Sequence, residues 1–153
     1  MYNSISYVIP VFNEEQNIEN TIKRIKSSFN KNNLTKYEII FVDDGSTDNT
    51  VELIKKFISE SFPIKCISLT RNFGHQAALT AGLKYAGNEL IAILDGDLQD
   101  PPEIINKFLE YSDLGYDVVY GVRRKRKEIF YKVLAYKIFY IILGKLSSIK
   151  IPL

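Results

Sequence analysis

The sequence predicts an α/β fold in which a mostly parallel sheet is covered by helices on both faces. Two observations support this class: apolar, strand-like runs alternate with helical patterns, and the connections between them are short. A third is that polar, turn-forming loops follow the strands rather than precede them. With 153 residues, of which 46% are hydrophobic, the chain can bury one sizeable core.

Five apolar runs rich in β-branched residues predict the strands. In chain order they are Ser6–Val11, Glu38–Val42, Ile64–Leu69, Leu90–Leu94 and Val118–Tyr120. Apolar residues that recur every three or four positions predict amphipathic helices between them. These helices are Glu14–Phe29, Asp48–Ser59, His75–Ala86 and Pro102–Tyr111. The alternation predicts a core of residues 1–122, in which the polar loops gather at the carboxyl edge of the sheet.

Residues 123–153 differ from this core in charge. The first 122 residues carry 11 basic and 17 acidic side chains, whereas the last 31 carry 9 basic and 1 acidic. The basic run 123–127 precedes the apolar, aromatic-rich segment Ile129–Leu143, which predicts an interfacial helix on an anionic membrane surface. Two alternatives are that this segment packs on the rest of a longer protein or binds nucleic acid. The acidic core disfavours nucleic acid as a partner.

Targeting and redox features are few. The N-terminus has no basic and apolar signal-peptide pattern, and no stretch reaches the ~20 apolar residues that a membrane-spanning helix needs. The single cysteine, Cys66, excludes an internal disulfide and suits a reducing compartment. We therefore expect the chain to lie peripherally at the cytoplasmic face of the cell membrane.

The turn that directly follows the fourth predicted strand is the part of the sequence most informative about function. Asp95 and Asp97 lie two residues apart directly after Leu90–Leu94, and Pro101 and Pro102 end the strand region. Neighbouring carboxylates repel each other, and Mg²⁺ or Mn²⁺ relieves this repulsion while also binding phosphate oxygens. The alternative is a solvated acidic turn that caps the next helix.

Three other loops carry polar residues that could contribute to a nucleotide site. Asp43 and Asp44 can accept hydrogen bonds from a ribose or base, or they can form an ordinary turn before the next helix. Arg71 can bind a phosphate or form a structural ion pair. Glu14 can reach the site or interact with its own helix dipole. His75 is interpreted as the start of a helix rather than a metal ligand.

Common phosphate-binding motifs are absent. The sequence contains neither the Gly-x-x-x-x-Gly-Lys-Ser/Thr loop nor a Gly-x-Gly-x-x-Gly motif after the first strand. These absences argue against a P-loop enzyme and a dinucleotide dehydrogenase.

Taken together, the motifs resemble the family 2 glycosyltransferases, which have the Rossmann-like GT-A fold. The resemblance rests on residues 8–15 (VIPVFNEE), 42–48 (VDDGSTD), 70–74 (TRNFG) and 95–103 (DGDLQDPPE). The last two motifs are most similar to those of the polyprenyl-phosphate and dolichyl-phosphate sugar transferases.

This resemblance implies an inverting, metal-dependent transfer of a hexose from a UDP- or GDP-sugar to a polyprenyl phosphate. The implied nucleotide-binding residues are Pro10, Asn13, Glu14, Asp43 and Asp44. The implied ligands of Mg²⁺ or Mn²⁺ are Asp95, Asp97 and Gln99, and the implied phosphate-binding residues are Arg71 and Arg123.

The resemblance also implies an Asp-containing loop beyond Leu153, so we expect a truncated chain whose catalytic residue is not assigned. Two other functions stay open. One is transfer to a saccharide hydroxyl in surface-polysaccharide synthesis, and the other is nucleotide-sugar binding without catalysis. A homo-oligomer is also left open.

Overall fold

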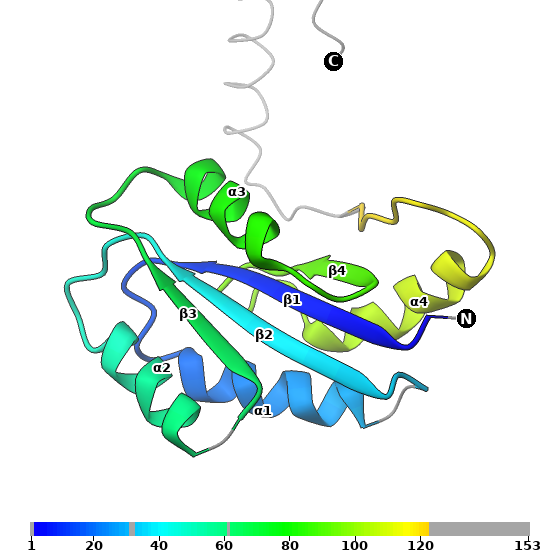
Figure 1. The fold of residues 1–153 in the computed structure, drawn as a ribbon, viewed down its shortest axis with the longest axis horizontal. Coiled ribbons are helices and arrows are strands. Elements are labelled where there is room, and N and C mark those ends of the chain that lie inside the picture. Colours follow the sequence, from blue (N-terminus) through cyan, green and yellow to red (C-terminus); the bar gives the residue numbers. More distant parts are fainter. Residues whose placement is uncertain (1, 31–32, 61, 123–153) are drawn as a thin grey trace, which may run out of the picture. The chain divides into compact units, whose positions relative to one another are not determined.

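The computed structural model describes residues 2–30, 33–60 and 62–122, and these form a four-stranded sheet with helices on both faces (Figure 1). In chain order the elements are β1 (Ser4–Val11), α1 (Ile18–Phe29), β2 (Lys36–Asp43), α2 (Thr50–Ser59), β3 (Ile64–Ser68), α3 (His75–Tyr85), β4 (Leu90–Ile93), the 3₁₀ turn η1 (Pro102–Ile104) and α4 (Ile105–Asp113). The chain divides into two compact units, residues 1–119 and 120–153, and all of these elements belong to the first. The predicted α/β class is confirmed.

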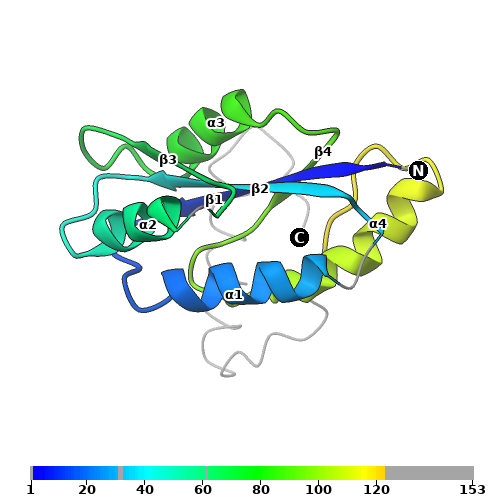
Figure 2. The ribbon, with the colours of Figure 1, turned by 60° about the horizontal axis from the view of Figure 1, so that its bottom comes forward.

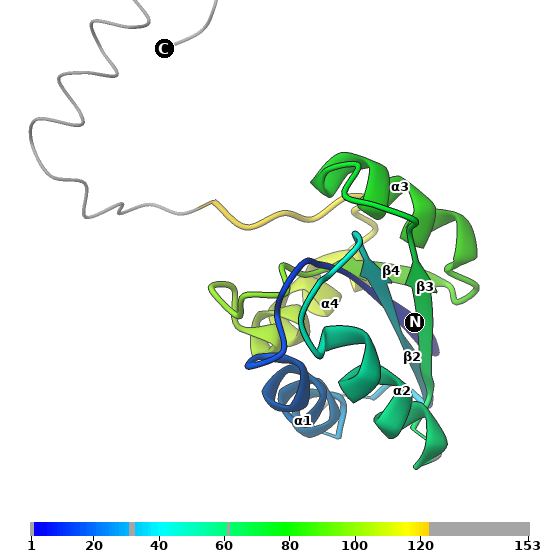
Figure 3. The ribbon, with the colours of Figure 1, turned by 90° about the vertical axis from the view of Figure 1, so that its left-hand side faces the viewer.

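The strands are arranged in the order β3-β2-β1-β4, and every pairing among them is parallel. Ser4 lies opposite Lys36 and Val11 lies opposite Asp43, so β1 and β2 end at the same level. Figure 3 views the sheet from the edge at which the strands end. Parallel pairing therefore brings the loops that follow β1, β2, β3 and β4 to one edge, as the sequence predicts.

The larger part of the core lies between the sheet and the helices α1, α2 and α4, which share one face (Figure 2). Side chains of alternate strand residues, such as Tyr7 and Phe41, are fully buried against α1 residues such as Ile22. The Nε and Nη2 atoms of Arg24 also donate hydrogen bonds to the two oxygens of the Glu103 carboxylate, at 3.0 and 2.7 Å, and so connect α1 to η1. This face is thus closed by packing and by a bidentate ion pair.

Helix α3 covers the opposite face through Ala78, which packs on Val8 and Val42. The register places Ile93 of β4 opposite Val8, and so on this same face. Ile91 and Ile93 are nevertheless 46% and 49% exposed. In the described part of the chain, the α3 face is therefore less completely covered over β4 than over β1 and β2.

Three expectations about the elements need correction. Val118–Tyr120 is not a strand, and the side chains of Val118 and Tyr120 are each 77% exposed. A run of three residues offers few ladder hydrogen bonds, so its apolar composition alone did not produce pairing. Helix α1 begins at Ile18 rather than Glu14, because residues 15–17 form a turn that precedes it.

Helix α2 similarly begins at Thr50 rather than Asp48. The Oδ1 atom of Asp48 accepts a hydrogen bond from the Thr50 backbone N–H at 3.0 Å, so Asp48 satisfies a helix N-terminus instead of continuing the helix. The predicted interfacial helix Ile129–Leu143, together with Arg123, lies outside the described residues.

Candidate functional site

The loops that follow β1 and β2 are joined by hydrogen bonds. The Asn13 backbone N–H donates to the Ser46 hydroxyl at 2.9 Å, and the Asn13 amide oxygen accepts from the Thr47 N–H at 2.8 Å. The Glu14 N–H donates to the Thr50 hydroxyl at 2.9 Å. The side chain of Asn13 therefore holds the two loops together, and this contact uses its amide oxygen.

Asp44 fixes the loop that follows β3. Its carboxylate is buried, and its two oxygens accept hydrogen bonds from the backbone N–H groups of Phe73 at 2.8 Å and Gly74 at 2.9 Å. Gly45 allows this close approach, since a Cβ atom there would lie 2.6 Å from the Arg71 carbonyl carbon. Asp44 thus determines where the loop before α3 runs.

Asp43 is the last residue of β2 and is also buried. Its Oδ1 atom accepts a hydrogen bond from the Ser46 backbone N–H at 3.0 Å, which closes the turn between β2 and α2. The adjacent acids therefore have separate structural tasks: Asp43 closes its own turn, and Asp44 anchors a loop about 30 residues away.

The turn after β4 is built around Gly96, which is packed against the end of β1. A Cβ atom on Gly96 would lie 2.9 Å from Cγ1 of Val11 and 3.0 Å from the carbonyl oxygen of Pro10. Asp95 and Asp97 flank this glycine, and both side chains are exposed. The Oδ1 atom of Asp97 accepts the Gln99 backbone N–H at 3.0 Å. The turn consequently presents two carboxylates to solvent beside β1.

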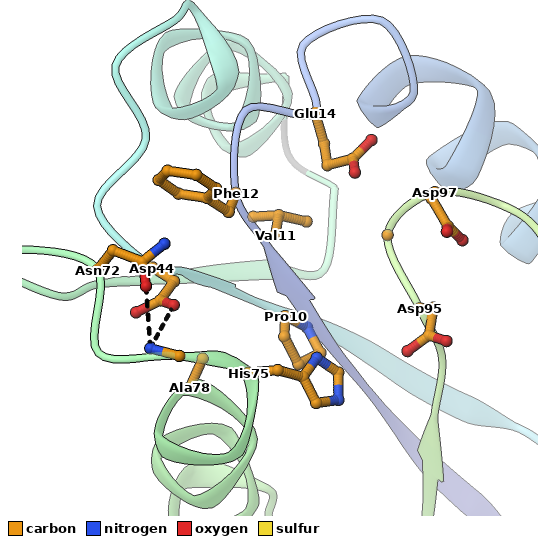
Figure 4. A pocket seen from close by; sticks show the side chains of 12 residues that line it. Pro10, Val11, Phe12, Glu14, Asp44, Asn72, His75, Ala78, Asp95 and Asp97 are labelled. Atoms are coloured by element: carbon orange, nitrogen blue, oxygen red, sulfur yellow. Dashed lines mark hydrogen bonds between the residues drawn. The ribbon is translucent and has the colours of Figure 1, made fainter. Parts of the chain in front are cut away.

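These loops enclose a pocket of about 530 Å³ at the carboxyl edge of the sheet (Figure 4). Its lining comes from the ends of β1 and β4, from the loops after β2 and β3, and from the start of α3. The lining residues are Pro10, Val11, Phe12, Glu14, Asp44, Asn72, Gly74, His75, Ala78, Asp95, Gly96 and Asp97. The structure therefore brings both aspartates of the predicted metal turn to the pocket that also contains Pro10, Glu14 and Asp44.

Other predicted site residues lie outside this lining. Asn13 and Asp43 hydrogen-bond to Ser46 in the loop after β2, and Gln99 follows the turn after β4; none of the three lines the pocket. The Arg71 guanidinium lies over the Phe73 ring, with its Cζ atom 4.7 Å from the ring centroid. Arg123 lies outside the described residues.

The lining is acidic. Glu14, Asp44, Asp95 and Asp97 contribute four carboxylates, whereas none of the lining residues identified in the described part of the chain is a lysine or arginine. The Glu14 carboxylate accepts a hydrogen bond from the Asn17 amide at 2.6 Å. An anionic ligand would meet repulsion here unless a cation accompanied it.

Of the lining residues that were not predicted to be part of a site, three have polar or aromatic side chains: Phe12, Asn72 and His75. Phe12 is 43% exposed and presents an aromatic ring to the pocket, and Asn72 lies near it (Figure 4). His75 does begin α3, as predicted, but it also lines the pocket. Periodicity gave no signal for these side chains because all three lie in loops or at a helix start. For Phe12, the signal available was a large aromatic residue directly after the first strand.

The fold and pocket define an α/β domain whose pocket lies where parallel strands end, which is where such sheets commonly bind ligands. Comparison with known sequences identifies the group to which this domain belongs. The model of Glycosyl transferase family 2 matches residues 6–146, and the chain therefore belongs to this family of glycosyltransferases.

Curated relatives agree with this assignment. The chain is 43% identical over 149 residues to the uncharacterized glycosyltransferase YkcC of Bacillus subtilis, covering 97% of this chain and 46% of the relative. It is 40% identical over 135 residues to the undecaprenyl-phosphate 4-deoxy-4-formamido-L-arabinose transferase of Pectobacterium atrosepticum, covering 88% and 41%. The chain thus spans less than half the length of these relatives.

Two solved structures illustrate the likeness in fold. The mannosyltransferase PcManGT of Pyrobaculum calidifontis, in complex with GDP-Man and Mn²⁺, is 26% identical, with a TM-score of 0.64 over 85% of this chain and 38% of that one. TarS 1-349 of S. aureus in complex with UDP is 23% identical, with a TM-score of 0.57 over 82% and 40%. The second likeness concerns the fold alone.

Proposed function

We propose that this chain forms the donor-binding part of an inverting glycosyltransferase that moves a hexose from a nucleoside-diphosphate sugar to a polyprenyl phosphate. The observation that carries the proposal is the joint presence of Asp95, Asp97, Phe12 and Asp44 in one pocket. A relative named for an undecaprenyl-phosphate substrate supports the acceptor. A structural neighbour solved with GDP-Man and Mn²⁺ supports the donor and a divalent ion.

The nucleoside would occupy the side of the pocket formed by the first three loops. The exposed Phe12 ring offers a flat surface to a base, and Pro10 forms the neighbouring floor (Figure 4). Asp43 and Asp44 accept backbone hydrogen bonds in the described structure, and a carboxylate oxygen has more than one lone pair. Asp44 and Glu14 can therefore still accept from a ribose, while Asn13 and Asp43 hold the loops.

The metal would be held by Asp95 and Asp97. Within the described residues, no group of three or more His, Cys, Asp or Glu side chains is arranged to hold a metal ion. Two exposed carboxylates still fit Mg²⁺ or Mn²⁺, because such ions are commonly held by one or two carboxylates and by substrate phosphates. When bound, the ion would neutralise the charge that develops on the departing diphosphate. Gln99 remains a proposed ligand through its position next to the turn.

To bind a phosphate, Arg71 would have to give up its contact with the Phe73 ring. Its guanidinium stacks on Phe73, and Phe73 is itself 50% exposed. The cation–π contact of an exposed pair contributes only about 0.5–1 kcal/mol, so a diphosphate can compete for the guanidinium. Arg71 and Arg123 thus stay proposed phosphate-binding residues.

The acceptor and the membrane are proposed from the relatives and the basic tail. None of the described helices is long and apolar enough to cross a bilayer. The nine basic residues in 123–153 would attract an anionic membrane surface, where a polyprenyl phosphate resides. We accordingly propose action at the cytoplasmic face of the cell membrane.

Isothermal titration with UDP and with GDP, each with and without Mn²⁺, tests the central claim. We expect at least one nucleotide to bind, and to bind more tightly when Mn²⁺ is present. Asp97→Ala should abolish the metal-dependent part, because it removes one of two proposed metal ligands. Asp113→Ala, at the end of α4, should leave binding unchanged. If neither nucleotide binds with Mn²⁺, or if both substitutions have equal effects, the proposal fails.

A further inference from the structure

His75 has a position in the pocket that the proposed function leaves without a role. It is the first residue of α3, and its side chain is exposed. Figure 4 shows its imidazole beside Pro10, on the side of the pocket that faces Asp95. Phe12 and Asn72 lie at the other side of the pocket, away from the two aspartates.

The backbone around His75 is held on both sides. The preceding residue, Gly74, donates its N–H to Asp44 at 2.9 Å, and Asp44 is itself buried. The Gly74 carbonyl then accepts from Ala77 and Ala78, at 3.0 and 3.2 Å, as α3 begins. The imidazole is therefore carried by a fixed backbone, although the ring itself is exposed to the pocket.

The His75 imidazole differs chemically from the other side chains that line the pocket. Four of the described lining residues are acids. Among all the described lining residues, His75 has the one side chain that can carry a positive charge and donate an N–H. A diphosphate held by a metal at Asp95 and Asp97 would present oxygen atoms toward the opposite wall. Hydrogen bonds from nitrogen donors to phosphate oxygens are strong because the acceptor is charged.

We propose that His75 is a diphosphate-binding residue that donates an imidazole N–H to the distal phosphate of the sugar nucleotide. This inference rests on the proposed function, because it takes the donor and the metal from it. The distal phosphate is specified because the His75 imidazole faces Asp95, whereas Phe12, the proposed surface for the base, lies farther from the two aspartates (Figure 4). The residue would thereby distinguish a nucleoside diphosphate from a monophosphate.

The test compares nucleotides that differ by one phosphate, in the 153-residue chain with Mn²⁺ present. UDP, UMP, GDP and GMP are titrated into the wild type, His75→Ala and His75→Asn. We expect His75→Ala to weaken diphosphate binding about tenfold, which is the lower range for loss of a hydrogen bond to a charged group. Monophosphate binding should be nearly unchanged, and His75→Asn, which keeps an N–H donor, should restore part of the difference.

Gln76→Ala is the matched control, since Gln76 is the next exposed residue of α3 and does not line the pocket. Equal losses of monophosphate and diphosphate affinity in His75→Ala, or no loss at all, would overturn the proposal for His75 while leaving the proposed function intact. If the wild type itself binds no nucleotide with Mn²⁺, the proposed function fails and this inference fails with it.

Discussion

The two sides of the pocket are stabilised in different ways. On the Phe12 side, the loops after β1, β2 and β3 are joined by direct hydrogen bonds, and the carboxylate that links the last two, Asp44, is buried. On the other side, Asp95 and Asp97 are exposed, and their turn is positioned by the close packing of Gly96 on β1. One side is therefore formed before any ligand arrives, whereas the other presents two like charges that a bound cation would neutralise.

This difference predicts that the acidic side chains of the two sides contribute to different properties, namely stability on one side and ligand binding on the other. Acids on the first side hold the fold, so their removal should change the free energy of unfolding. Acids on the second side cost the fold electrostatic repulsion, so their removal should change ligand binding instead. The same residue type thus has opposite consequences within one pocket.

Of the substitutions that test this difference, Asp44→Ala should have the largest effect on the free energy of unfolding. The substitution leaves the N–H groups of Phe73 and Gly74 without their carboxylate partner and frees the loop before α3. We expect a loss of about 3 kcal/mol in the free energy of unfolding, measured by urea denaturation, because hydrogen bonds to a charged group are removed at a buried site.

Asp95→Ala is the matched control for Asp44→Ala. Asp95 is exposed, so its substitution should change the unfolding free energy by less than about 0.5 kcal/mol. Equal destabilisation by the two substitutions would show that the two sides of the pocket do not differ as described.

Gly96→Ala tests how the second side is positioned. The added methyl group would meet Val11 and the Pro10 carbonyl at about 3 Å, so the turn or β1 must move. We expect a cost of about 1–3 kcal/mol, typical of overpacking, together with weaker Mn²⁺-dependent nucleotide binding because Asp95 and Asp97 are displaced. Thermal denaturation and titration measure the two effects.

Gly87→Ala provides the control for this substitution. A Cβ atom at Gly87 would meet only ordinary van der Waals contact, 3.9 Å from the Glu38 carboxylate. It should change stability little and binding not at all. A similar loss of binding in both variants would mean that the close packing of Gly96 does not position the aspartates.

The sequence predicted one side of the pocket better than the other. An apolar strand followed within a few residues by a proline pair locates Asp95 and Asp97 at a sheet edge, and the structure brings both to the pocket. The anchoring role of Asp44 was not predictable, because its partners follow about 30 residues later and no local pattern records that contact. Phe12 was missed for a related reason, since a single aromatic residue in a turn has no periodicity.

The same reasoning explains the errors in the elements. The predicted helix Glu14–Phe29 ends at the same residue as the observed helix Ile18–Phe29, because burial of one helix face leaves a repeated pattern. The helix starts were less accurate because side-chain contacts such as that of Asp48 with Thr50 decide them. Val118–Tyr120 was predicted as a strand from composition alone, and pairing depends on a neighbouring strand edge as well.

Glu38 is a hydrogen-bonded carboxylate near the start of β2, at the edge of the sheet opposite the pocket. Burial alone would raise the pKa of Glu38, but hydrogen bonds from Lys65, Ser6 and the Gly87 N–H outweigh it and hold the pKa below its ordinary value. A lowered pKa means that the stabilisation is present above the unfolded pKa of about 4.3 and is lost as the pH falls through the lower folded value.

Glu38→Gln should therefore remove about 1 kcal/mol of stability at pH 7 and less at acidic pH. Urea denaturation of both proteins at several pH values measures this, with Glu52→Gln in α2 as the control because that carboxylate is exposed. A constant difference between the wild type and Glu38→Gln at all pH values would contradict the assigned ionisation.

Tyr7→Phe should have the smallest effect on the free energy of unfolding, and it should increase this free energy rather than lower it. Tyr7 lies on β1, the strand that ends in the pocket floor, and its ring is fully buried with an edge-on contact to Tyr37. Its hydroxyl oxygen has no hydrogen-bond partner among the described residues, and burial raises the pKa of this phenol well above its ordinary value. Removing the hydroxyl deletes an unsatisfied polar group while keeping the ring.

We therefore expect Tyr7→Phe to raise the unfolding free energy by up to about 1 kcal/mol, which thermal denaturation can detect. Nucleotide binding should not change, because the hydroxyl faces the α1 side of the sheet and the pocket lies beyond the end of the strand. A clear loss of stability would show that the hydroxyl has a partner, such as a buried water, and that the core beneath the pocket contains polar contacts. The contrast between a hydrogen-bonded rim and an apolar core beneath it would then need revision.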